Sequence, residues 1–133
     1  MSGESALHVR LVERLIAHIQ DRHPAPRGLL LLADHHAYGA NRPSTIDGFT
    51  PDVFASDLPA TFEVIGEAKT PLDLESPRSA RQLAVFLDYL ALRPNSSFYL
   101  AVAPLTAART WAVLNRIRRP AHAGVAITVI DGV

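Results

Sequence analysis

Residues 51–70, with the sequence PDVFASDLPATFEVIGEAKT, decide the fold of this chain. Residues 53–55 and 61–68 are two runs rich in apolar and β-branched side chains, which is typical of strands. Residues 56–59 between them combine serine, aspartate and proline, which are turn-forming residues. We therefore predict a β-hairpin. Because side chains alternate faces along a strand, Glu67 and Lys69 point the same way.

This hairpin would bring two carboxylates and one amine to one end of a sheet. If the strands pair near their open end, Asp52 lies beside Glu67, and Lys69 follows two residues later. Magnesium prefers oxygen ligands, usually from one or two carboxylates, and completes its shell with water and phosphate oxygens. A lysine beside such a metal can orient or deprotonate an attacking water. The pattern predicts metal-assisted hydrolysis of a phosphodiester.

The pattern Pro51-Asp52, a variable gap and then Glu67-Ala68-Lys69 resembles the motif of the PD-(D/E)xK nuclease superfamily, also called restriction-endonuclease-like. The resemblance implies a nuclease in which Asp52, Glu67 and the Ala68 carbonyl bind one or two Mg²⁺ (or Mn²⁺) ions. It also implies that Lys69 positions the attacking water. The substrate implied is nucleic acid, with DNA expected first and RNA as the alternative.

The elements expected around the motif follow the order found in that superfamily, which is a helix, three strands, a helix and a strand. We predict one α/β domain over residues 1–133, with a three-layer arrangement in which helices flank a central mixed β-sheet. Its αβββαβ core carries an additional C-terminal helix and strand. Apolar periodicity and turn residues place the helices and strands outside the hairpin at residues 6–22, 29–33, 77–92, 97–103, 106–117 and 124–130, with a loop over 70–75.

Two residues on the predicted helices are candidate additions to the site. Glu13 lies at the edge of the first apolar stripe; the resemblance implies an acid near the metal there, and a solvated flank residue is the alternative. Gln82 lies on the helix after the motif. One branch of the superfamily, the recombination exonucleases, has a glutamine there with a tyrosine four residues later, but here Phe86 stands at that place and the tyrosine is Tyr89. Gln82 binds the substrate phosphate or holds Lys69, or it is an exposed helix residue.

Other polar residues leave alternatives open. A transition-metal site at Asp34-His35-His36 is one hypothesis, but adjacent residues on an extended chain face opposite ways, so we expect a polar strand end. Glu63 shares the face of Glu67 and is either a further acid at the site or exposed. The loop over residues 38–50 could form a wall of the site and supplies candidate phosphate contacts at Asn41, Arg42 and Ser44.

The overall charge does not favour strong nucleic-acid binding, because thirteen basic residues balance thirteen acidic ones. A basic concentration surrounds the last predicted helix and either contacts a nucleic-acid backbone or complements the helix dipole; it consists of Arg109, Arg116, Arg118 and Arg119. A second hypothesis therefore stands beside the nuclease. In it the chain is a catalytically inactive module of this fold that binds nucleic acid or a partner protein.

Composition sets the expected surroundings of the chain. It contains no cysteine, which excludes disulfides and thiolate sites and fits a reducing, cytoplasmic environment. The N-terminus carries Glu4 and no long apolar run, so we expect no signal peptide. The run from Leu29 to Ala33 is too short to span a membrane. Small nucleases of this fold commonly act as dimers, so the resemblance implies a homodimer, or assembly with a larger partner.

Overall fold

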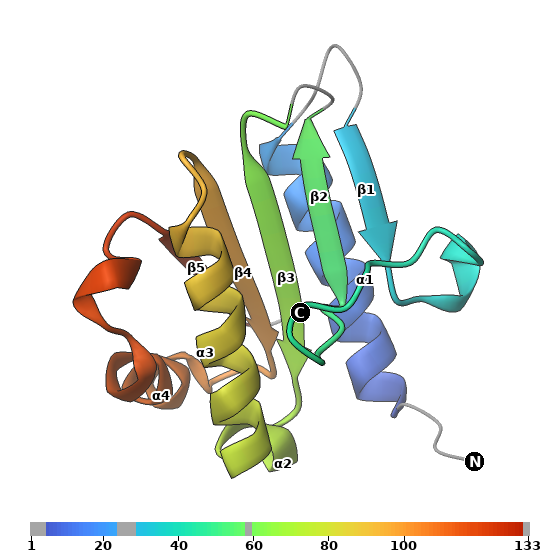
Figure 1. The fold of residues 1–133 in the computed structure, drawn as a ribbon. Coiled ribbons are helices and arrows are strands. Elements are labelled where there is room, and N and C mark those ends of the chain that lie inside the picture. The colour runs from blue at the N-terminus through green and yellow to red at the C-terminus, as the bar shows by residue number, and fades with distance from the viewer. Residues whose placement is uncertain (1–4, 24–28, 58–59, 132–133) are drawn as a thin grey trace.

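Five strands form one mixed sheet in the order β1-β2-β3-β4-β5 (Figure 1). The computed structural model describes residues 5–23, 29–57 and 60–131. β2 (Val53–Asp57) and β3 (Glu63–Lys69) are antiparallel, and β1 (Leu29–Ala33) lies antiparallel to β2. β4 (Ser96–Val102) runs parallel to β3, and β5 (Ala126–Asp131) runs parallel to β4. The predicted hairpin is thus the centre of the sheet.

Helices cover both faces of this sheet and complete a three-layer α/β arrangement (Figure 1). α1 (Ala6–Arg22) packs on one face against β2, β3 and β4. On the other face, α3 (Pro77–Ala91) packs on β3 and β4, and α4 (Ala107–Ile117) packs on β5. No helix in the described ranges is long and apolar enough to cross a membrane.

The helix starts follow from their capping residues. The Ser5 hydroxyl accepts a hydrogen bond from the His8 backbone N–H at 3.1 Å, and Ser76 does the same for Ser79 at 3.1 Å. Such caps satisfy donors that a helix start leaves without a partner. Pro77 occupies the first turn of α3, where its missing N–H costs nothing.

Two apolar cores lie on opposite sides of the sheet. The core under α1 is closed by a close approach at Gly66, where a Cβ would lie 3.2 Å from Ile19 Cδ1 and 3.3 Å from Leu15 Cδ2. A small residue on β3 therefore lets α1 reach the sheet. The core on the other face contains the predicted stripe of α3, all of it buried; its members are Leu83, Phe86, Leu87 and Leu90.

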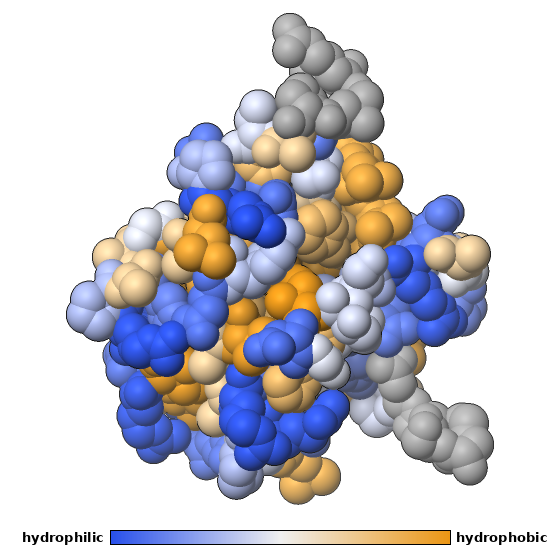
Figure 2. All heavy atoms as spheres, in the orientation of Figure 1, coloured by the Kyte–Doolittle hydropathy of each residue, from blue (hydrophilic) through white to orange (hydrophobic). Residues whose placement is uncertain are grey.

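One part of the sheet remains exposed. Leu30 on β1 is 47% exposed, and Figure 2 shows apolar surface over β1 and β2 beside α3. A hollow of about 260 Å³ lies here, between the end of β1, the loop around Ser44 and the side chain of Tyr89. The loop therefore lines a hollow over β1 and β2.

The sequence-based description of the fold is confirmed at the level of a three-layer α/β domain, and most boundaries agree within two residues. The predicted loop over residues 70–75 is wrong in part, because α2 (Pro71–Leu74) forms a helical turn there with proline in its first turn. Two 3₁₀ helices, His36–Tyr38 and Pro120–His122, were not predicted. Three residues used in the predictions lie outside the described ranges: Glu4, Leu58 and Pro59.

Candidate active site

The hairpin places the three motif side chains together. Val53 pairs with Gly66, so Asp52 and Glu67 face each other at the open end of the hairpin. Glu67 and Lys69 share the face of β3 that carries α3, as strand alternation predicts. All three are buried, with exposed fractions of 7% for Asp52, 2% for Glu67 and 8% for Lys69.

Asp52 and Glu67 are held by hydrogen bonds from each other's strand. Glu67 Oε1 accepts from the backbone N–H of Asp52 at 2.8 Å. Asp52 Oδ2 accepts from the backbone N–H of Ala68 at 2.8 Å. Because each carboxylate binds a backbone group of the opposite strand, both positions are fixed by the sheet itself. The role of the Ala68 carbonyl stays a prediction.

Burial raises the pKa of Glu67 well above its usual range, because a charged carboxylate loses its hydration there. The neighbouring charge of Asp52 raises this pKa further, and the Lys69 ammonium opposes both effects. The site thus disfavours ionisation of both carboxylates at the same time. Two adjacent carboxylates with one raised pKa are a common feature of functional sites.

Lys69 is held between the sheet and α3. Its Nζ lies 3.5 Å from Glu67 Oε2 and donates a hydrogen bond to Gln82 Oε1 on α3. Gln82 therefore accepts a hydrogen bond from Lys69, and holding Lys69 is one of the roles expected for Gln82 from the sequence. Lys69 is also the only lysine in the chain, since the other basic residues are all arginine.

His8 is a neighbour of the site that sequence reasoning missed. It lies in the first turns of α1, and its Nε2 is 3.4 Å from Asp52 Oδ2. A signal was present, because His8 precedes Val12 by four residues and Leu15 by seven, which puts a polar side chain on the apolar stripe. Such a residue is buried when the helix packs.

Glu13 has a different partner from the one that the resemblance implies. Its Oε2 lies 2.9 Å from Nε2 of His35, a buried residue at the end of β1. His35 Nδ1 accepts from the Ala37 backbone N–H at 3.0 Å, so Nε2 carries the proton and donates to Glu13. Glu13 therefore contacts the end of β1 rather than the Asp52–Glu67 pair.

The Asp-His-His cluster does not gather around one point. Asp34 pairs with Arg42 at 3.0 Å, His35 binds Glu13, and His36 stacks on His35 with ring centroids 4.3 Å apart. In residues 5–23, 29–57 and 60–131, no group of three or more His, Cys, Asp or Glu side chains is placed to hold a metal ion. The expected polar strand end describes this segment better than a metal site.

Glu63 belongs to a separate contact with α3. Its Oε1 accepts from the Tyr89 hydroxyl at 2.6 Å, and its Oε2 lies 3.0 Å from Arg93 Nε. Burial and this carboxylate raise the pKa of the Tyr89 hydroxyl. Of its two sequence-based roles, neither a further site acid nor an exposed residue fits, because Glu63 ties β3 to α3.

Searches with this chain among protein-family models, curated proteins and solved structures find no match.

Proposed function

We propose that this chain is a metal-dependent nuclease of the restriction-endonuclease-like kind, which hydrolyses phosphodiester bonds in DNA, with RNA as the alternative substrate. One observation carries the proposal: the single lysine of the chain is buried beside two carboxylates at the end of the hairpin. A lysine amine can lose its proton and serve as a base, which the arginine guanidinium cannot do. The ion pairs of Asp34, Glu63 and Glu75 all use arginine.

The donor groups of the site fit a hard divalent cation. Two carboxylates lie together, and burial and the Asp52 charge raise the pKa of Glu67, so a bound cation would favour its ionised form. Mg²⁺ and Mn²⁺ bind proteins through few carboxylates and carbonyls, with waters and phosphate oxygens as their other ligands. Asp52, Glu67 and the Ala68 carbonyl would hold the ion. Once bound, the ion would stabilise charge on the scissile phosphate and the leaving oxygen.

The remaining residues act on water and on one another. Lys69 positions the attacking water, and its place 3.5 Å from Glu67 Oε2 keeps it beside the carboxylate pair. Gln82 is a positioning residue, because its side-chain oxygen fixes the Lys69 amine. His8 supports Asp52 from α1. Glu13 has no part in this proposal, since it holds His35.

A catalytically inactive module of this fold is the second candidate. It is favoured by the hydrogen bonds that Asp52 and Glu67 accept from backbone N–H groups, since these alone give both carboxylates a structural role. Titration calorimetry with Mn²⁺ separates the two candidates. A nuclease binds the ion and loses binding in Asp52→Asn, whereas an inactive module shows no binding that depends on Asp52.

Cleavage of a substrate panel tests the function itself. Single-stranded, duplex and branched DNA and RNA are incubated with the protein and Mg²⁺ or Mn²⁺, with chelator as control. The proposal expects cleavage that chelator abolishes and that Asp52→Asn removes. Cleavage unchanged in Asp52→Asn would assign the activity to another source. The homodimer, or assembly with a larger partner, stays a prediction.

A further inference from the structure

α1 carries a line of cationic side chains. Arg10, Arg14 and Arg22 share one side of the helix with His18, because each follows the previous member by four residues or a multiple of four. We call Arg10, Arg14 and Arg22 the arginine line. It was not evident as a charge cluster in the sequence, because acidic and apolar residues separate its members.

The arginine line has no anionic partner among the described residues, where no carboxylate pairs with any of its members. Its Arg14 Nε is also buried without a hydrogen-bond acceptor in that part of the chain. Two arginines of the predicted basic concentration, by contrast, are engaged: Arg109 with Glu75 at 3.1 Å, and Arg119 with Asp88. Since no described carboxylate pairs with these arginines, they form a local positive field on a chain of zero net charge.

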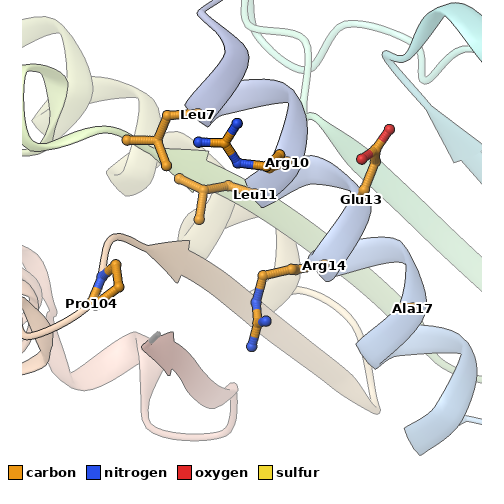
Figure 3. A pocket seen from close by; sticks show the side chains of 7 residues that line it. All are labelled: Leu7, Arg10, Leu11, Glu13, Arg14, Ala17 and Pro104. Atoms are coloured by element: carbon orange, nitrogen blue, oxygen red, sulfur yellow. The ribbon is translucent and has the colours of Figure 1, made fainter. Parts of the chain in front are cut away.

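A hollow of about 470 Å³ adjoins the start of the arginine line. Leu7, Leu11 and Pro104 give it apolar walls, and Arg10 and Arg14 flank it (Figure 3). Glu13 also borders the hollow, but its carboxylate points away from the other labelled side chains (Figure 3). That carboxylate is hydrogen-bonded to His35. The volume lies in the range of about 300–1,000 Å³ that is common for sites of small organic groups.

The hollow opens at the same end of the sheet as the candidate active site. α1 begins beside it, since His8 contacts Asp52 at 3.4 Å and Arg10 follows two residues later. Pro104 follows β4, whose last residue, Val102, pairs in register with Lys69. A polymer that lies along α1 would therefore come to the end of the sheet at which Asp52 lies, and Glu67 and Lys69 lie at the same end on the α3 side.

We propose that the arginine line and its hollow bind one strand of nucleic acid, with guanidinium groups on the phosphates and an unstacked base in the hollow. Four residues of helix rise by about 6 Å and turn by about 40° beyond one full turn, so these cations form a row that winds gradually around α1. Guanidinium groups bind phosphate with paired hydrogen bonds. Charged rows beside apolar surface for bases are the common features of single-strand sites. The inference rests on the proposed function, because this strand is the one that the site would cut.

Fluorescence anisotropy with a short labelled single strand tests the inference, in chelator so that no cleavage occurs. Arg10→Gln/Arg14→Gln is compared with Arg116→Gln/Arg118→Gln, which removes equal charge at the end of α4 on the opposite face. We expect the double substitution on α1 (the α1 pair) to weaken binding about tenfold or more, and the double substitution at the end of α4 (the α4 pair) to weaken it much less. The slope of log affinity against log salt should fall by about 1.4 in the α1 pair, at about 0.7 per lost contact.

Arg10→Lys/Arg14→Lys is the conservative variant and should keep most of the salt dependence, because it retains both charges. Circular dichroism must show that every variant is folded. Equal losses in the α1 and α4 pairs would overturn the proposal. If the α1 pair loses as much affinity for duplex as for single-stranded nucleic acid, the assignment to one strand is overturned.

These outcomes are independent of the proposed hydrolysis. If the arginine line binds single strands but the wild-type protein cuts no substrate, the nuclease proposal fails and the inference stands. If the wild-type protein cuts and the α1 pair cuts with unchanged KM, the inference fails and the nuclease proposal stands.

Discussion

Asp52 and Glu67 brace the open end of the hairpin together. The Glu67 carboxylate accepts a hydrogen bond from the backbone N–H of Asp52 at 2.8 Å. The Asp52 carboxylate accepts one from the backbone N–H of Ala68, the residue after Glu67, at 2.8 Å. The bonds that set the positions of the carboxylates therefore also join β2 to β3. This double role means that stability and activity respond differently to changes at the site.

Glu67→Gln should increase stability at neutral pH in the absence of metal. The pKa of Glu67 is higher in the folded protein than its ordinary value of 4.5, because of burial and the Asp52 charge. Above that ordinary value, the folded protein retains a proton that the unfolded chain releases, so its free energy of unfolding falls as pH rises. Glutamine does not ionise, so Glu67→Gln removes this loss of unfolding free energy. Urea unfolding in chelator, from about pH 4 to about pH 8, should show the two proteins diverging as pH rises.

The matched control for this measurement is Glu75→Gln, since Glu75 is exposed and pairs with Arg109 on the surface. Loss of that pair should lower stability by less than about 1 kcal/mol. A Glu67→Gln protein that is less stable than the wild-type protein at neutral pH would contradict the assigned cause of the pKa shift.

Gln82→Ala should lower the rate of cleavage by about tenfold to a hundredfold, because Lys69 loses the acceptor that fixes its amine. Gln82→Glu keeps an oxygen acceptor and should retain more activity. Gln20→Ala, on the exposed side of α1, is the control. Since Lys69 is the only lysine, the NMR signal of its side chain should also broaden or shift in Gln82→Ala. An unchanged signal and rate would remove Gln82 from the site.

Gly66→Ala should destabilise the fold by about 1–3 kcal/mol. The new methyl group would lie 3.2 Å from Ile19 Cδ1 and 3.3 Å from Leu15 Cδ2, so these side chains must shift and the contact between α1 and β3 is disturbed. Gly124→Ala is the matched control, because a Cβ there meets nothing within 4 Å. Thermal unfolding of both variants checks the difference. Equal melting temperatures would mean that α1 does not depend on the small residue.

The local patterns of the sequence were sufficient for most of the fold. Apolar periodicity and the caps at Ser5 and Ser76 determine where α1 and α3 begin, since both signals lie within a few residues. The position of Asp52 beside Glu67 was expected only if the strands pair near their open end, and the pairing of Val53 with Gly66 shows that they do. The helical turn at Pro71 was missed because four residues carry no periodicity.

The surroundings of the site depend on contacts between distant segments, which no local pattern specifies. The contact of His8 with Asp52 exists only because α1 packs across β2 and β3. Glu13 has the expected position at the edge of a stripe, but the end of β1 presents His35 to it. Whether an arginine is paired depends likewise on where tertiary packing places the acids, so net charge alone missed the arginine line.

The cleavage rate of Lys69→Gln relative to the wild-type protein, measured in Mn²⁺ on the best substrate of the panel, is the most direct test of the proposed chemistry. The wild-type protein should cut, and the variant should be slower by about 10²–10⁴-fold while remaining folded, because the amine that positions the attacking water is gone. Equal rates for the two proteins, or a wild-type protein that binds Mn²⁺ and cuts nothing, would contradict the assignment of Asp52, Glu67 and Lys69 as a nuclease site.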